Sequence, residues 1–154
     1  MPSRPSVTEE LHTLGALLRA PFDAMLAYNF GRLAEAGFAD VRPAHGAVLR
    51  HIARDGSRLT ELAERAHMTK QSMAELVAYL RRRGYVELRP DPGDRRAKLV
   101  TLTERGWQVH AALVRHSRDF ERECARALGR EKWRRLRALL EEFAAWSHGA
   151  QRRG

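Results

Sequence analysis

Hydrophobic positions recur at helical spacing along most of this chain, and short polar turns separate the helices that they predict. From about residue 7 to 36 the apolar residues fall three or four positions apart, and Pro21 predicts a kink or a restart within that helix. Pro43 is suited to the first turn of a second helix, which the turn residues Asp55 and Gly56 are expected to stop. The N-terminal third is therefore predicted to be helical.

Two short helices are predicted next, each with a candidate N-cap. Thr60 is expected to cap the first, and Thr69 the second, which ends at Gly84. The apolar stripe of the second helix is Met73, Leu76, Val77 and Leu80.

The C-terminal third is predicted to consist of two further helices. Thr103 caps a long one that reaches about Leu128, and Gly129 breaks it. The last helix has apolar residues on one face, namely Trp133, Leu136, Leu140, Phe143 and Trp146.

A β-hairpin is predicted between the two sets of helices. Residues 85–88 alternate as a strand, residues 98–102 return as a second strand, and Pro90, Pro92 and Gly93 force the turn. The order of elements is typical of a mainly α fold with a small β-hairpin wing, a winged helix-turn-helix with additional N- and C-terminal helices.

The hairpin tip is basic. Arg95 and Arg96 are adjacent there, and arginine at the end of a finger suits the negative potential of a DNA minor groove. Residues 81–98 contain seven Lys or Arg and three acids, a net charge of +4 out of +9 for the chain. A merely solvated surface does not predict such a concentration.

The composition agrees with a polyanionic partner. The 154 residues carry a formal charge of +9 and are 44% hydrophobic, which predicts one domain, or one domain with helical arms. Nucleic acid is the first candidate and an anionic membrane surface the second, although no apolar run is long enough to span a bilayer. A single cysteine, Cys124, and a start without an apolar signal core predict a cytoplasmic protein.

The two short helices have the features of a DNA reader. Ala63 and Ala66 allow close helix crossing, and His67 is expected in the turn at positive φ. The next helix begins with residues suited to the major groove, namely Thr69, Lys70, Gln71 and Ser72. Lys70 suits phosphate or guanine and Gln71 suits adenine, whereas Thr69 and Ser72 suit phosphate contacts or only cap their own helix.

The terminal helices expose more apolar surface than so small a module needs for its own core. A homodimer is the simplest way to cover it, and packing of the terminal helices on each other in a monomer is the alternative. The expected segments are residues 1–40 as an N-terminal dimerisation arm, 41–103 as the DNA-binding lobe and 104–154 as C-terminal dimerisation helices.

Four stretches of the sequence together resemble the MarR family of bacterial transcriptional regulators: Leu59 to Ala66, Met68 to Met73, Leu80 to Val86, and Asp91 to Gly106. The resemblance implies that Asp94 holds the wing arginine, Arg96, in place for the minor groove. Arg95 is expected to contact phosphate, and Lys98 is expected to be a further DNA contact. The resemblance also implies an obligate homodimer on a pseudo-palindromic double-stranded DNA operator.

Many such regulators release DNA when a small aromatic or phenolic effector binds. The candidate effector-binding residues interrupt apolar faces, and ordinary packing is the competing interpretation of each: His12, Tyr28, His45 and Trp107. Cys124 is interpreted as a packed residue, and the seven histidines have no metal-ligand spacing. No cofactor, metal or catalytic site is expected, since no nucleotide-binding or hydrolase motif is present.

The function expected from these features is that of a non-enzymatic, sequence-specific regulator, a repressor relieved by a small-molecule ligand. A nonspecific or architectural DNA-binding protein is the alternative. A protein-interaction module on a winged-helix scaffold is the third possibility, because fold alone does not determine function.

Overall fold

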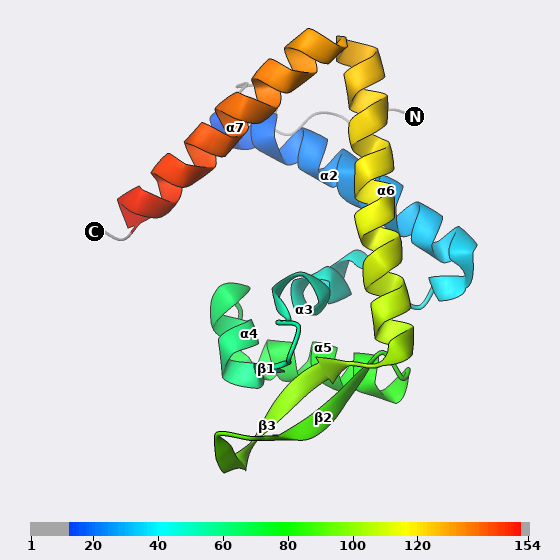
Figure 1. Cartoon of the computed structure of the whole chain (residues 1–154), viewed down its shortest axis with the longest axis vertical. Helices are drawn as coiled ribbons and strands as arrows, with labels where there is room; N and C mark the ends of the chain where they lie inside the picture. Colours follow the sequence, from blue (N-terminus) through cyan, green and yellow to red (C-terminus); the bar gives the residue numbers. More distant parts are fainter. Residues whose placement is uncertain (1–12, 152–154) are drawn as a thin grey trace. The chain divides into compact units, whose positions relative to one another are not determined.

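The computed structural model describes residues 13–151 (Figure 1). The described chain forms two compact units, residues 13–116 and residues 117–151. The first contains the helix-turn-helix and the sheet, and the second is purely helical. No helix among the described residues is both long and apolar enough to cross a membrane.

The first unit begins with helix α2, Leu14–Leu33, which Thr13 caps through its side chain. The helix continues through Pro21, so the predicted restart is wrong. Pro21 lacks the N–H that would reach the carbonyl of Leu17, but the residues on both sides remain helical, so the loss is local. A π-helical turn, η1 (Ala34–Phe38), follows directly.

Three α-helices form the body of this unit. A 3₁₀ turn, η2 (Pro43–His45), leads into α3 (Gly46–His51), as expected from Pro43. After it come α4 (Leu59–Arg65) and α5 (Lys70–Arg82). These two are the predicted short helices.

One of the two predicted caps is confirmed and the other is wrong. The Thr69 hydroxyl accepts a hydrogen bond from the backbone N–H of Ser72 at 3.1 Å. Thr60, however, lies inside α4, whose N-cap is Arg58. The Arg58 backbone N–H donates to Glu61 Oε2 at 3.1 Å. Because this bond caps the helix at Arg58, α4 begins before Thr60.

The sheet has three antiparallel strands, one more than the predicted hairpin. They are β1 (Ser57–Arg58), β2 (Val86–Asp91) and β3 (Asp94–Leu102), in the order β1-β3-β2. Pro90 lies within β2 opposite Lys98 rather than in the turn, so the hairpin is longer than predicted.

The core of the first unit lies between the helices and the sheet. Met73, Val77 and Leu80 of α5 are buried, which confirms three members of the predicted stripe, and Leu76 is half-buried against them. Gly106 fits against the sheet only because it lacks a side chain: a Cβ there would lie 2.1 Å from the carbonyl oxygen of Tyr85.

Helix α6 (Glu104–Leu128) begins in the first unit and continues into the second. The Gly106 backbone N–H donates to the Thr103 hydroxyl, which confirms that cap, and Gly129 adopts a φ of +86° where the helix ends. Helix α7 (Arg130–Gln151) follows. None of the side chains described from residue 117 to 149 is buried.

Candidate nucleic-acid interface

The turn between α4 and α5 has the geometry of a helix-turn-helix. His67 adopts a φ of +52°, as predicted for this position, and the backbone N–H of Met68 donates to the carbonyl of Ala63 at 2.9 Å. Ala63 is buried and Ala66 half-buried, so small side chains lie where the helices approach each other. The turn therefore fixes the direction in which α5 begins.

The first residues of α5 are exposed, namely Thr69, Lys70, Gln71 and Ser72. Besides its capping bond, the Thr69 hydroxyl donates to Ser72 Oγ at 2.9 Å, so these two side chains are engaged with each other. Lys70 forms no ion pair within residues 13–151, and it extends beside the capped helix start. The arrangement presents a cation, an amide and two hydroxyls together.

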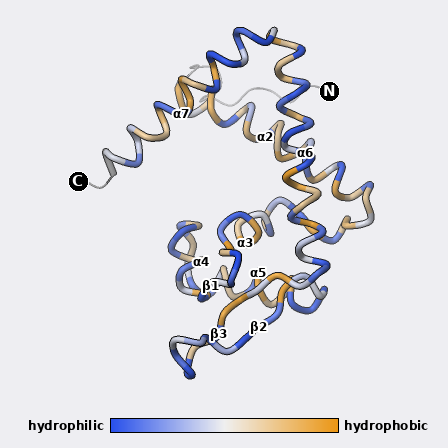
Figure 2. Tube along the Cα trace, viewed as in Figure 1, coloured by the Kyte–Doolittle hydropathy of each residue, from blue (hydrophilic) through white to orange (hydrophobic). Residues whose placement is uncertain are grey.

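The wing retains three unneutralised cations. Glu87 pairs with Arg89 at 2.6 Å, and the other two acids of the hairpin are engaged elsewhere. Across the described part of the chain, no carboxylate forms an ion pair with Arg95, Arg96 or Lys98. Figure 2 shows the resulting hydrophilic tip at the β2–β3 turn and the more hydrophobic strand ends near α6.

Arg58 is a wing contact that the sequence analysis missed. Its Nε lies 2.7 Å and its Nη2 2.6 Å from Asp91 Oδ2, across 33 positions of sequence. The backbone N–H of Gly93 and the Arg58 guanidinium both stabilise the ionised carboxylate, and they hold the pKa of Asp91 below its usual value. No local sequence signal pairs residues so far apart.

Asp94 contacts the backbone at the hairpin tip. Its Oδ1 accepts a hydrogen bond from the backbone N–H of Arg96 at 3.0 Å, and its Oδ2 lies 3.9 Å from Arg58 Nη2. The carboxylate thus shapes the chain at Arg96, and the Arg96 guanidinium is left without an ion pair to any of residues 13–151.

Two candidate effector residues have ordinary packing partners. His45 is buried, its Nδ1 accepts from the Arg42 backbone N–H at 2.9 Å, and its ring stacks on Tyr79 with centroids 4.4 Å apart. Tyr28 is half-buried with the Arg32 guanidinium 4.5 Å from its ring centroid. His12 lies outside the described residues.

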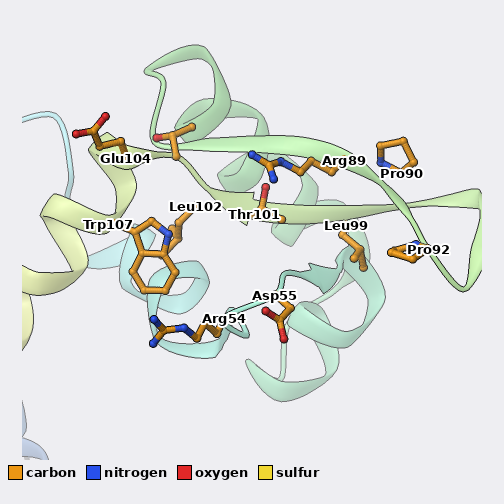
Figure 3. Close-up of a pocket in the computed structure, with 11 residues that line it drawn as sticks. Arg54, Asp55, Arg89, Pro90, Pro92, Leu99, Thr101, Leu102, Glu104 and Trp107 are labelled. Atoms are coloured by element: carbon orange, nitrogen blue, oxygen red, sulfur yellow. The ribbon is translucent and has the colours of Figure 1, made fainter.

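Trp107 is the candidate that lies at a cavity. An open cavity of about 650 Å³ lies on the outer face of the β2–β3 sheet (Figure 3). Trp107 and Arg54 lie on one side of it, with the guanidinium 5.8 Å from the ring centroid, and Arg89 lies on the other. Neither Tyr28 nor His45 lines this cavity, so it does not bring the candidate effector residues together.

Neither thiol nor metal chemistry stands out in the described residues. Cys124 is half-buried, and burial, followed by the nearby Glu123 carboxylate, raises its pKa, which disfavours the reactive thiolate. Residues 13–151 contain no cluster of three His, Cys, Asp or Glu arranged to hold a metal ion.

These elements define a winged helix with an exposed helix start and a basic wing. Known proteins are similar to this chain in sequence and in fold. A sequence model of the MarR family matches residues 39–97. Over 69 residues the chain is 39% identical to the transcriptional regulator HosA of Escherichia coli O111:H-, a match that covers 44% of this chain and 51% of HosA. The chain thus spans about half the length of this curated relative.

Solved structures extend the likeness over most of the chain. The transcriptional regulator Tm0710 of Thermotoga maritima matches with a TM-score of 0.63 and 25% identity, covering 87% of this chain and 93% of Tm0710. The repressor CouR, solved with a 23-mer DNA duplex, matches in fold with a TM-score of 0.67 and 23% identity, covering 92% of this chain and 99% of CouR.

The match to the family model covers the winged helix, so residues 39–97 are similar to the MarR family. The relatives are named transcriptional regulators, in agreement with the expectation that the chain is not an enzyme.

Proposed function

We propose that this chain is a sequence-specific DNA-binding regulator that acts as a homodimer on a pseudo-palindromic operator. The observation that carries the proposal is that one compact unit presents both the exposed start of α5 and a wing with three unpaired cations, Arg95, Arg96 and Lys98, as judged over residues 13–151. Helix starts of this kind read major-groove edges, and arginines enter narrow minor grooves. The repressor CouR, which is similar in fold, has been solved bound to a DNA duplex.

Each compact unit supplies apolar surface for the dimer. Helix α2 exposes Leu14, Leu17, Leu18 and Phe22, and α7 exposes Leu136, Leu139, Leu140, Phe143 and Trp146. Contiguous exposed apolar side chains of this size mark interaction surfaces. A second copy covers both sets with the same residues, and a twofold dimer matches the symmetry of an inverted repeat.

The regulator is proposed to act as a repressor, with relief by a small aromatic or phenolic molecule. The exposed Trp107 ring at the 650 Å³ cavity offers an aromatic contact for such a molecule. Binding relieves repression only if the ligand has different affinities for the DNA-bound and free states. Because the proposed partner is operator DNA, the protein is expected to work in the cytoplasm.

Selection of duplexes from random sequence tests the proposal, with bulk competitor DNA at physiological salt. Enrichment of an inverted repeat with half-sites about one helical turn apart is the expected outcome. Salt-sensitive binding without an enriched sequence contradicts operator reading and favours an architectural role. Absence of all duplex binding favours a protein-interaction role for the winged helix.

A further inference from the structure

Arg58 connects the helix-turn-helix to the wing. It is the last residue of β1 and the N-cap of α4, where its backbone N–H donates to Glu61. Its guanidinium extends to the wing, with two nitrogens at 2.7 and 2.6 Å from Asp91 Oδ2 and one at 3.9 Å from Asp94 Oδ2. One side chain therefore touches two acids that flank the β2–β3 turn.

The Asp91 carboxylate is held from both sides. Its Oδ1 accepts from the backbone N–H of Gly93 at 2.8 Å, while Oδ2 receives Arg58. The Asp91 side chain is 12% exposed and that of Arg58 41%, so the carboxylate is largely shielded from water while the guanidinium stays partly solvated. The hydrogen bond to Asp91 also raises the pKa of Arg58, which is the complementary effect to the lowered pKa of Asp91.

The backbone ladder alone does not join the wing tip to the body. Strand β1 pairs with β3 only at Val100 and Leu99, whereas the tip lies at the other end of β3, where the strand begins at Asp94. The register between β2 and β3 is irregular between Pro90 and Asp91, so the ladder is weakened next to the turn. The Arg58–Asp91 pair bridges this interval.

The second ion pair of the wing, Arg89–Glu87, lies within a single strand and does not connect the wing to the helices. Arg89 and Glu87 both belong to β2, and their side chains are 66% and 42% exposed. A pair within one strand cannot orient the wing relative to the helices. It therefore provides a matched control for the pair that spans two elements.

We propose that Arg58 is a positioning residue for DNA recognition, which fixes the wing through Asp91 and Asp94 so that Arg95 and Arg96 meet the DNA while α5 occupies the major groove. This inference rests on the proposed function. A wing held in place before binding does not have to be ordered on the DNA, so affinity increases without any direct contact from Arg58.

Amide hydrogen exchange in the full-length protein tests the positioning without DNA. Arg58→Met, which keeps the aliphatic stem, and the milder Asp91→Asn are expected to speed exchange of the amides in residues 93–98, while the core amides of α5 keep their protection. Arg89→Ala is expected to leave the tip unchanged. Unaltered exchange at the tip in both Arg58→Met and Asp91→Asn overturns the proposal.

The affinity for duplex DNA then tests whether positioning of the wing matters for binding. Asp91→Asn is the most informative variant, because the two explanations predict opposite changes in its affinity. Removing a negative charge beside DNA should strengthen binding if only the net field matters. The proposal requires the opposite, a loss of about three- to thirty-fold, with little further loss when Arg58→Met is added. Tighter binding by Asp91→Asn, or independent losses that multiply in the double variant, overturns it.

Two further readouts separate positioning from a direct contact. Arg58→Met is expected to leave the salt slope of binding unchanged, because no phosphate contact is lost, and to weaken discrimination between A·T and G·C pairs in the flanks. A salt slope lower by about one assigns Arg58 to a phosphate instead and overturns the positioning role. If the unaltered protein binds no duplex, the proposed function fails, and the exchange experiment still decides whether Arg58 holds the wing.

Discussion

The core of the first unit and the apolar face of α7 contrast in the exposure of their large side chains. In residues 13–116 the large residues Leu62, Met73 and Leu80 have no exposed surface. In α7, Leu139 is 54% and Trp146 63% exposed, although their spacing along the helix is as regular. The comparison teaches that periodicity identifies which face of a helix is apolar, whereas it does not identify what covers that face.

The difference has an energetic consequence. Each large side chain moved from water to an interior contributes about 1.5–3 kcal/mol, so the buried core residues of the first unit obtain this stabilisation within one chain. The five large residues exposed on α7 obtain it only from another surface. The proposed dimer supplies that surface.

The largest effect is expected when the apolar face of α7 becomes charged. Leu140→Asp combined with Phe143→Asp should yield a monomer by sedimentation and reduce affinity for the inverted repeat about 10²- to 10⁴-fold, because both half-sites are no longer bound together. Arg134→Asp, which changes net charge equally in an exposed ion pair with Glu131, is the control. A dimer that persists in the double variant contradicts this assignment of the interface.

Shortening a covered leucine should cost nearly as much. Leu80→Ala removes a fully buried side chain and is expected to lower the free energy of unfolding by about 2–5 kcal/mol in urea denaturation. Leu139→Ala should act only through the dimer, so its effect depends on protein concentration, unlike that of Leu80→Ala. Equal behaviour of the two variants on dilution would remove the distinction between the units.

At the DNA surface, Arg96→Ala should weaken operator binding by about 1–3 kcal/mol if its guanidinium enters the minor groove. Fluorescence anisotropy at matched salt measures the change. Arg134→Ala, at an exposed position of the second unit, controls for the loss of one charge. The minor-groove role of Arg96 is refuted if both variants bind alike.

A smaller effect distinguishes the true helix cap from the false one. Thr69→Ala removes the acceptor for the Ser72 N–H and should cost about 1 kcal/mol of stability. Thr60→Ala, at an exposed position inside α4, should be close to neutral. Thermal unfolding of the pair checks the difference, and a larger cost at Thr60 would contradict the observed start of α4.

The smallest effect is a dependence of stability on pH. Burial first, and then the positive charge of Arg42, lowers the pKa of His45 below 6.5 in the folded protein. Because the unfolded chain then takes up the proton first, the stability from neutral His45 is present above pH 6.5 and is lost as pH falls toward the lower folded value. Denaturation between pH 5 and 7 should show a shallower slope in His45→Gln, and an unchanged slope would exclude His45 as a contributor.

Several helix boundaries, including that of the proposed DNA-reading helix α5, were predictable from local signals. The Thr69 and Thr103 caps, the positive φ of His67 and the ends at Gly84 and Gly129 agree with the structure, because each depends on backbone bonds within a few residues. The cap at Thr60 and the restart at Pro21 were misjudged because a local preference was outweighed, by the Glu61 bond at Arg58 for Thr60 and by continuation of α2 for Pro21. The alternative expectation at Pro21, a kink, stays a prediction.

For the residues proposed to contact DNA, exposure was likewise predictable and long-range packing was not. The exposure of Lys70, Gln71, Arg95 and Arg96 followed from the predicted helix start and hairpin tip, and it agrees with the structure, while their contacts with DNA remain predictions. The place of Trp107 beside Arg54 at the cavity could not be predicted, because it depends on how α6 packs against the loop after α3.

The order of helices, the hairpin, the apolar stripes and the concentration of positive charge around the wing could all be predicted from the sequence. These follow from the periodicity of side chains and from hydrogen bonds between near neighbours. The pairing of β1 with the sheet, the contact of Arg58 with Asp91 and the set of side chains that form the core of the first unit emerge only from the folded structure. Such contacts join residues far apart in sequence, and their partners are determined by the packing of whole elements.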